Sequence, residues 1–365
     1  MNPNFLPDDV DFASYLELTD AKAKVKPAAQ WIDDLKAGLI ENKTQKLVYL
    51  PWEKSKSLFH FREGEVTLWS GQNGHGKSLM TSQIALSLIG QDQSVCIASF
   101  EMKPLTTLKR MSRQFIGMNP YAEEFQGDDG IDVLKGLYDE FGSWISKWLW
   151  FYDQQGSADT QTVLGMVKYC AEELKIKHIF IDSLMKCVKG EDDYNGQKNF
   201  IDTITAIARD YQCHIHLVHH LRKPKDENEV PDKHDNKGSG AITDQVDNVM
   251  LVWRNKRKED DVKVKGDKSN HKTEPDARLL CRKQRNAEHE RQHTEGGESV
   301  IPDDGAKEET LLAAQGHPTA RAMRGRIPEA REASRLVTRG ADGRATVRTP
   351  PAGRFPEDVR SESHA

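Results

Sequence analysis

The chain has 365 residues, of which 30% are charged, and its formal net charge is −5. This acidic balance excludes a protein coated in basic charge, so contacts with nucleic acid would need a local patch or a channel. No apolar run approaches the roughly 20 residues that span a bilayer, and the acidic N-terminus lacks the layout of a signal peptide. These features predict a cytoplasmic protein with no membrane partner.

The cysteines are scattered along the chain without the C-x-x-C spacing of zinc sites: they are Cys96, Cys170, Cys187, Cys213 and Cys281. Two of them, Cys96 and Cys213, lie in apolar runs typical of buried strands. We therefore expect free thiols that fill a core in a reducing compartment, with zinc or disulfides as the less favoured alternative.

The first of three zones, residues 1–44, is predicted to be an N-terminal linker. Within it, the stretch AAQWIDDLKAGLIENK (28–43) places its apolar residues at helical spacing. Such a helix either packs on the core of its own chain or docks on a neighbouring subunit. The sequence leaves both alternatives open.

The second zone, residues 45–290, alternates apolar runs typical of strands with stretches typical of helices. The strand-like runs are 65–71, 94–101, 148–153, 178–184, 214–221, 248–255 and 277–283. The helical stretches include 77–90, 105–117, 162–176 and 199–212. This alternation predicts an α/β fold with a mainly parallel twisted sheet and helices on both faces. Ligands bind at the carboxyl ends of such strands, and we expect the motifs below to lie there.

The third zone, residues 291–365, has a single aromatic residue, Phe355, and is dominated by Arg, Ala, Gly, Pro and Glu. Its apolar content is too low to offset the entropy lost on ordering. We predict a disordered tail.

A phosphate-binding motif, G-x-x-x-x-G-K-S, occupies residues 71–78 between an apolar strand and a helical stretch. Glycines let backbone N–H groups converge on phosphate oxygens, and the start of the helix adds its dipole. Lys77 would reach the β- and γ-phosphates, and the Ser78 hydroxyl would bind Mg²⁺. The alternative is a plain glycine turn. The residues predicted to bind ATP are Gly71, Gln72, Asn73, Gly74, His75, Gly76, Lys77, Ser78 and Leu79, and we assign no side-chain role to His75.

Two carboxylates follow neighbouring strand-like runs and could complete a hydrolytic site. Asp182 ends HIFID, which suits a Walker B carboxylate that holds Mg²⁺, although an acid at a strand end is often a plain turn residue. Glu101 follows SVCIASF and could orient and deprotonate the attacking water. On chemistry alone, an acid that stabilises a helix start is an equal alternative for Glu101.

Several segments occur in a fixed order: GQNGHGKSLMTSQIA, FEM, IDSL, HLVHHLRKP, KGSGAITDQVDNVMLVWRN and RKQRN. Together they resemble the helicase domain of DnaB-like hexameric replicative helicases, in particular phage primase-helicases and Twinkle, over residues 55–288. The resemblance implies a RecA-like P-loop NTPase core that assembles into a ring. It further implies ATP hydrolysis with Mg²⁺, 5′ to 3′ movement on single-stranded DNA, duplex unwinding in phage or prophage DNA replication, and a primase or helicase-loader partner.

The resemblance also assigns roles to residues around the phosphate. Glu101 matches the catalytic glutamate, and His220 matches the residue that senses the γ-phosphate, while the neighbouring His219 is expected to be buried. Lys283 and Arg285 match a K-x-R pair that reaches the γ-phosphate of a neighbouring subunit. A solvated basic strand end is the alternative for this pair.

Loops that grip single-stranded DNA come from the region after His220 in the family. The candidates are Lys237, Gly238 and Ser239, with Arg222 and Lys223 as secondary ones. Backbone amides there can meet phosphates without reading sequence. A solvated surface loop is the alternative.

The chain departs from the family in two places. No primase or zinc-binding region precedes residue 45, so priming is not expected from it. After the K-x-R pair, the glycine and the aromatic strand of the family are replaced by an aromatic-poor sequence, and we hypothesise a frameshift or a replaced C-terminus near residues 287–291. The alternatives to a helicase are a RecA-like recombination or regulatory ATPase and an inactive helicase remnant.

Overall fold

The computed structural model describes residues 4–5, 32, 36, 47–117, 119–120, 125, 127–190, 192–222, 230–232, 235–238, 240–286, 337–339 and 345–347. Almost all of the predicted helix 28–43 and most of the predicted tail lie outside these residues, as does the hypothesised frameshift point. Within the predicted tail, two short strands, β11 (Val337–Arg339) and β12 (Ala345–Val347), pair in antiparallel fashion.

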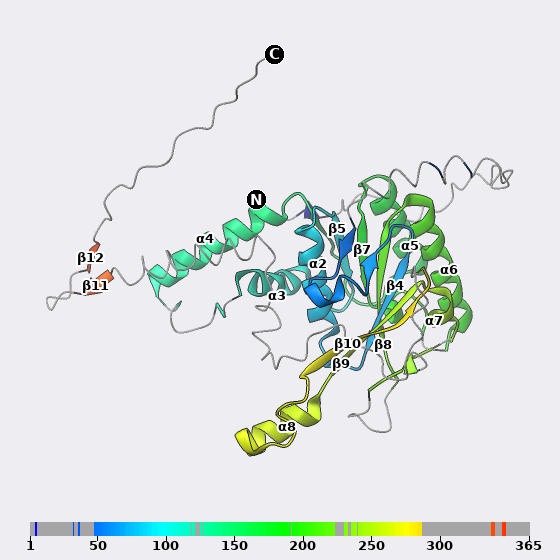
Figure 1. Cartoon of the computed structure of the whole chain (residues 1–365). Helices are drawn as coiled ribbons and strands as arrows, with labels where there is room; N and C mark the ends of the chain where they lie inside the picture. The colour runs from blue at the N-terminus through cyan, green and yellow to red at the C-terminus, as the bar shows by residue number, and fades with distance from the viewer. Residues whose placement is uncertain are drawn as a thin grey trace, which may run out of the picture.

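An eight-stranded sheet forms the centre of the molecule, in the order β1-β6-β5-β7-β8-β4-β9-β10 (Figure 1). Its strands are β1 (Asn4–Phe5), β4 (Val66–Gly71), β5 (Val95–Ser99), β6 (Leu149–Tyr152), β7 (His178–Asp182), β8 (His214–His220), β9 (Asn248–Arg254) and β10 (Ala277–Gln284). All neighbours run parallel except β9 and β10. Every strand predicted from the sequence is present, and β1 adds a strand from the segment predicted to be a linker.

Helices cover both faces of the sheet, as the alternation predicts (Figure 1). One face carries α2 (Lys77–Ile89), α3 (Pro104–Ile116) and α4 (Asp128–Ile145), whose far end extends away from the sheet. The other carries α5 (Thr160–Glu172), α6 (Tyr194–Tyr211) and the short α7 (Ala241–Gln245). Each face has its own apolar core. The strand β4 is buried along its whole length because both faces are covered.

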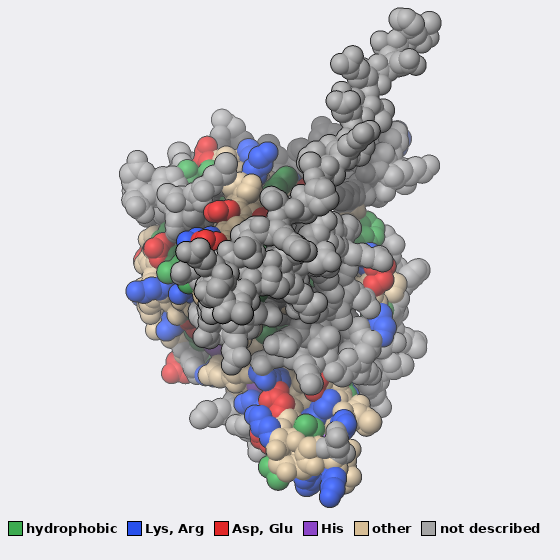
Figure 2. Space-filling view, turned by 90° about the vertical axis from the view of Figure 1, so that its left-hand side faces the viewer, with side chains coloured by type: hydrophobic (Ala, Val, Ile, Leu, Met, Phe, Trp, Pro, Cys, Tyr) green, Lys and Arg blue, Asp and Glu red, His purple; other side chains and the backbone are tan. Residues whose placement is uncertain are grey.

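Smaller elements decorate the edges. A hairpin of β2 (Val48–Tyr49) and β3 (His60–Phe61) packs on the core below α2, and 3₁₀ turns lie at Glu53–Ser55, Leu184–Lys186 and Gly266–Lys268. The helix α8 (Lys256–Lys265) lies between β9 and β10 and projects from the sheet (Figure 1). In Figure 2 this projection is the lobe at the bottom, with basic side chains beside acidic ones, such as Lys265 with Asp261.

The reversed direction of β10 corrects one expectation. Its last residues pair with the first of β9, as Gln284 does with Asn248, and Asn248 in turn pairs with Thr67 near the start of β4. Lys283 and Arg285 therefore lie at the amino edge of the parallel strands. The expectation that all motifs lie at the carboxyl edge is wrong for this pair.

Among the described residues, no helix has both the length and the apolar character needed to cross a membrane.

Candidate nucleotide site

The phosphate loop joins the end of β4 to the start of α2. Gly74 and Gly76 have φ angles of 79° and 86°, a region that side chains with a Cβ rarely adopt, so the loop needs glycine there. α2 begins directly after, at Lys77. The N-terminus of a thirteen-residue helix thus lies behind a loop of free backbone N–H groups, which is the arrangement that binds phosphate.

Lys77 is 7% exposed and folds back over its own loop. Its Nζ donates to the carbonyl oxygens of Gly71 and Gln72 at 2.8 and 3.1 Å. Burial lowers the pKa of this amine, while the nearby carboxylates of Asp182 and Glu101 act in the opposite direction. The two carbonyl bonds hold the ammonium at the mouth of the loop, and a phosphate oxygen could replace them.

The other loop residues differ in exposure. Gln72 and His75 are buried, Asn73 and Gly74 are exposed, and Leu79 is half-buried, its carbonyl accepting a hydrogen bond from Gln114 Nε2.

Ser78 and Asp182 meet as a Mg²⁺ site requires. The Ser78 hydroxyl donates to Oδ2 of Asp182 at 3.1 Å, and Asp182 ends β7. Burial raises the pKa of Asp182, and the charge of Glu101 adds to this, so a cation would relieve two crowded acids. Hydroxyl and carboxylate oxygens suit Mg²⁺, which in nucleotide sites takes few protein ligands and shares phosphate oxygens. The residues fit the metal, whose chemistry when bound is to neutralise charge on the phosphates.

Glu101 and His220 face each other across the same edge of the sheet. The His220 Nε2 donates to Glu101 Oε1 at 3.3 Å, and the Ser183 hydroxyl donates to the same oxygen at 3.1 Å. The hydrogen bond from His220 is the main cause that lowers the pKa of Glu101, against the opposing effect of burial. The Glu101 side chain is 37% exposed, so an ionised carboxylate is presented to solvent beside Asp182 and the loop.

The two adjacent histidines point in different directions. His219 is fully buried, and its Nε2 donates to the carbonyl oxygen of Lys237 at 2.8 Å. The N–H of Lys237 in turn donates to the carbonyl oxygen of His220 at 3.1 Å. The end of β8 therefore holds the segment 235–238 on one side and faces Glu101 on the other. The burial predicted for His219 is confirmed.

The residues predicted to bind DNA are only partly described, because Lys223 and Ser239 lie outside the described residues. Arg222 is exposed, and its Nη2 donates to the carbonyl oxygen of Gly238 at 3.1 Å. Gly238 has a φ angle of 78°, and a Cβ there would clash with the side-chain oxygen of Gln197. Lys237 and Gly238 are half-buried.

His75 contributes a contact that the motif did not reveal. Its buried ring accepts, at Nδ1, the N–H of Arg254 at 3.1 Å, which ties the phosphate loop to the end of β9. Burial, followed by the charges of Lys256 and Lys77, lowers the pKa of His75 to about 4. The motif allows any residue at this position, so the pattern carried no signal for it.

Lys283 and Arg285 share one face, as predicted from their spacing, but they lie far from this site, at the opposite edge of the sheet. Lys283 Nζ donates to the carbonyl oxygens of Thr243, Asp244 and Val246 at 2.7–2.8 Å. Arg285 binds the same turn after α7 and the carboxylate of Asp247.

Comparison with known proteins places this geometry among P-loop ATPases. Residues 53–226 match the model of a family described as an AAA domain. A solved ATPase domain of a DnaB-like replicative helicase is 15% identical to the chain, with a TM-score of 0.56, over 70% of this chain and 91% of that one. A DnaB-like replicative helicase, solved in a study of its interactions with primase, is 16% identical with a TM-score of 0.50. The match covers 62% of this chain and 54% of that longer chain.

The comparisons confirm the predicted RecA-like fold and the resemblance to DnaB-like helicases noted in the sequence. At 15–16% identity, the similarity to the solved structures concerns the fold. Together with the AAA domain, it supports an ATPase role for the chain.

Proposed function

Because this chain carries an AAA domain and has the fold of DnaB-like replicative helicase ATPase domains, we propose that it is the motor subunit of a ring-shaped DNA helicase. The proposed activity is ATP hydrolysis at the interfaces between subunits, coupled to movement on single-stranded DNA and to unwinding of the duplex ahead. The proposed ATPase domain spans residues 45–290.

The observation that carries the proposal is the separation of two half-sites on one sheet. The phosphate loop, Glu101 and Asp182 lie at the carboxyl edge, and Lys283 and Arg285 lie at the amino edge. A pair at the amino edge is remote from the phosphate loop of its own chain, since the strands of the sheet lie between them. Head-to-tail contact of identical chains would bring the two edges together, and such contacts close into rings.

The residues at the carboxyl edge have distinct tasks in this proposal. Lys77 exchanges its carbonyl bonds for phosphate oxygens and follows the charge that develops on the transferred phosphoryl group. Glu101, held ionised by His220 and Ser183, orients the attacking water and takes up its proton at a carboxylate oxygen.

Arg285 and Lys283 of a neighbouring subunit would complete the site. A guanidinium supplied in trans stabilises charge in the transition state of phosphoryl transfer. Hydrolysis would then depend on assembly of the ring, for which a hexamer is our expectation.

The contacts around His220 support a route from nucleotide to DNA. The same strand end meets Glu101 through one histidine and the Lys237 backbone through the other. Loss of the γ-phosphate contact at His220 would therefore be felt at the segment that we propose to grip single-stranded DNA, with Lys237, Gly238, Ser239, Arg222 and Lys223 as its contacts. Such a grip on phosphates is independent of sequence.

The wider role that we propose is replication of phage or prophage DNA, with movement from 5′ to 3′ and a primase or helicase loader as partner. One of the similar structures concerns a helicase and its interactions with primase, and this supports a search for such a partner.

Strand displacement on a forked DNA tests the proposal. The wild-type chain, Lys77→Ala and Glu101→Gln are compared with ATP and Mg²⁺, with and without single-stranded DNA. We expect the wild-type chain to form a ring, to hydrolyse ATP faster with DNA and to displace the strand. Loss of the general base costs about 10²–10⁴-fold in rate, so Glu101→Gln should bind nucleotide but scarcely hydrolyse it.

A monomeric wild-type chain that is inert on the fork would contradict the proposal. Helical filaments in electron micrographs, with ATPase activity but no unwinding, would instead favour a RecA-like recombination ATPase. ATPase activity equal in wild type and Lys77→Ala would indicate a remnant without a working site.

A further inference from the structure

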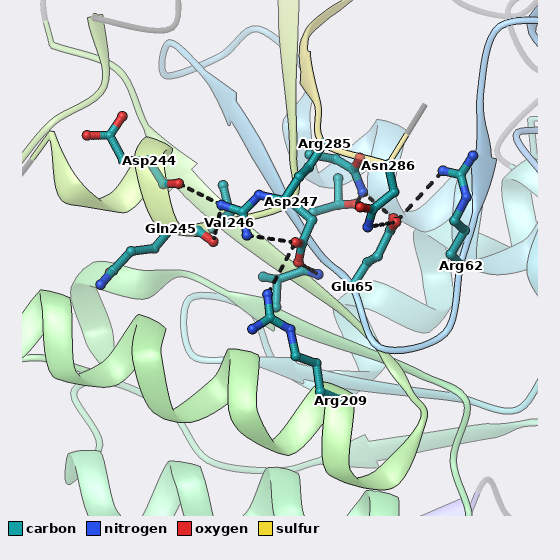
Figure 3. Close-up of polar contacts among 12 residues, drawn as sticks. Arg62, Glu65, Arg209, Asp244, Gln245, Val246, Asp247, Arg285 and Asn286 are labelled. Atoms are coloured by element: carbon teal, nitrogen blue, oxygen red, sulfur yellow. Dashed lines mark hydrogen bonds and ion pairs between the residues drawn. The ribbon is translucent and has the colours of Figure 1, made fainter. Parts of the chain in front are cut away.

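A buried carboxylate lies between Arg285 and the first residue of β4 (Figure 3). Asp247 precedes β9 and is 2% exposed. Its Oδ1 lies 3.2 Å from Nη1 of Arg285, and its Oδ2 accepts the N–H of Val66 at 3.0 Å. The backbones are joined as well, because the N–H of Arg285 donates to the Asp247 carbonyl oxygen at 2.9 Å.

A second buried acid, Glu65, holds the residue after Arg285. Its Oε1 accepts from Asn286 Nδ2 at 2.9 Å, and its Oε2 accepts from Asn248 Nδ2 at 2.8 Å (Figure 3). Asn286 follows the end of β10, so its anchor limits the motion of the chain directly beyond Arg285. Both anchors lie beside the start of β4, the buried central strand that ends at the phosphate loop.

The remaining bonds of Arg285 leave part of its guanidinium at the surface. Its Nη2 donates to the carbonyl oxygens of Asp244 and Gln245 at 2.8 and 3.1 Å, and the side chain is 38% exposed. These carbonyl groups are neutral, whereas Asp247 supplies a full negative charge. A second arginine, Arg209, approaches Asp247 from α6 at 3.6 Å and is 55% exposed.

We propose that Asp247 is the positioning residue for Arg285 in the reaction between subunits. This inference rests on the proposed function, in which Arg285 acts on the nucleotide of a neighbour. A long, half-exposed arginine samples many rotamers, and the ionic bond to a carboxylate fixed on a rigid strand selects one of them. Displacement of a reacting group by about 1 Å can cost 10²-fold in rate.

Asp247→Asn provides the direct test, because it keeps the shape and the oxygen that accepts the Val66 N–H but removes the charge that Arg285 faces. We expect kcat of the assembled ATPase to fall by about 10²-fold, with KM and nucleotide affinity unchanged, since the phosphate loop of each subunit is untouched. The double variant with Arg285→Ala should be no slower than Arg285→Ala alone, because both act through one guanidinium.

Arg209→Ala is the matched control. It removes the other cationic partner of Asp247 without touching Arg285, so we expect a rate close to that of wild type. A large loss in Arg209→Ala equal to that in Asp247→Asn would indicate that Asp247 serves the local charge balance rather than Arg285, and would overturn the inference.

Mixed rings separate a positioning role from a folding defect. Asp247→Asn subunits keep a working phosphate loop, and Lys77→Ala subunits keep a working Arg285. When the two inactive variants are mixed, we expect ATPase activity to return at the interfaces where an intact loop meets an intact arginine. No recovery with Asp247→Asn, when Arg285→Ala does recover, would assign Asp247 to folding and overturn the inference.

The outcomes also distinguish the inference from the proposed function. A wild-type rate in Asp247→Asn beside a slow Arg285→Ala would overturn the inference alone. A wild-type rate in Arg285→Ala would contradict the intersubunit site, and the inference would fall with it.

Discussion

At the scale of single residues, His75 links the phosphate loop to a strand that lies far away in the sequence. Because the N–H of Arg254 donates to Nδ1, the neutral ring must carry its proton on Nε2. The low pKa of about 4 keeps the ring neutral near pH 7, so this acceptor is available throughout the physiological range. The bond fixes the loop from outside the motif.

We predict that His75→Ala destabilises the loop. The substitution leaves the Arg254 N–H buried without its acceptor, which costs about 1–3 kcal/mol, and opens space beside Gly76. We expect a lower free energy of unfolding and weaker binding of a non-hydrolysable ATP analogue, measured by denaturant titration and calorimetry. His75→Asn places an amide oxygen near the Nδ1 position and should recover much of both. Equal stability and affinity in wild type and His75→Ala would show that the bond contributes nothing.

The motifs predicted the contacts around the phosphate better than those around the loop. Ser78 meets Asp182 and Glu101 meets His220, as the motif pattern and the resemblance imply. The bond of His75 to the β9 backbone could not be foreseen, because main-chain partners leave no trace in the identity of a residue.

At the scale of elements, apolar runs predicted every strand that lies between two layers of helices. What they could not supply was strand direction, since a buried strand reads alike in both directions. The antiparallel β10 therefore moved Lys283 and Arg285 to the opposite edge. Two helices were also missed: α4 contains several glycines, and α8 has the sequence KRKEDDVKVK, which lacks an apolar stripe.

The strands β7 and β8 bring buried histidines together beneath the β2–β3 hairpin. The indole N–H of Trp69 donates to His216 Nδ1 at 3.1 Å, which puts the proton of His216 on Nε2. This N–H then donates to His178 Nδ1 at 3.0 Å. His214 stacks on His178 with ring centroids 5.7 Å apart. Each bond requires a neutral ring.

Burial lowers the pKa of these histidines, well below the usual value for His178 and His216 and to about 4 for His214. The unfolded chain binds their protons below about pH 6.5, whereas the folded chain does not until the pH is far lower. Stability is therefore complete above this pH and is lost as the pH falls from 6.5 towards 4. The slope is about 1.4 kcal/mol per pH unit for each such histidine.

We predict that His178→Asn reduces this slope. The asparagine oxygen can accept the His216 N–H, but it has no proton to gain in this range. Urea unfolding followed by tryptophan fluorescence at several pH values between 4 and 7 measures the slope, and we expect it to fall by about 1.4 kcal/mol per pH unit. His271→Asn, on the α8 projection, is the control and should leave the slope unchanged. An unchanged slope in His178→Asn would contradict the prediction.

At the scale of the whole molecule, the sheet separates the two halves of the proposed site. The carboxyl edge presents the phosphate loop, and the amino edge presents Arg285 on its buried acid anchors. A single chain cannot fold one edge onto the other, because the intervening strands are covered on both faces. Catalysis would therefore require contact between chains, and the reaction rate should report on assembly.

We predict that the ATPase rate per chain rises with protein concentration, in step with assembly measured by analytical ultracentrifugation. An arginine supplied in trans contributes roughly 10³–10⁵-fold to related phosphoryl-transfer rates, so the dissociated chain should be nearly inactive although it binds ATP. Single-stranded DNA, which would occupy the ring, should shift the rise to lower concentration by favouring the assembled state.

Arg285→Ala distinguishes this dependence from simple stabilisation of the chain by its neighbours. If assembly acts by supplying Arg285, the variant should still assemble at high concentration, yet its rate should remain at the level of the dissociated wild type. If assembly only stabilised each subunit, the rate of the variant would rise with concentration as that of wild type does. A wild-type rate per chain that is the same before and after assembly would place the complete site within one subunit, against the separation of the two edges.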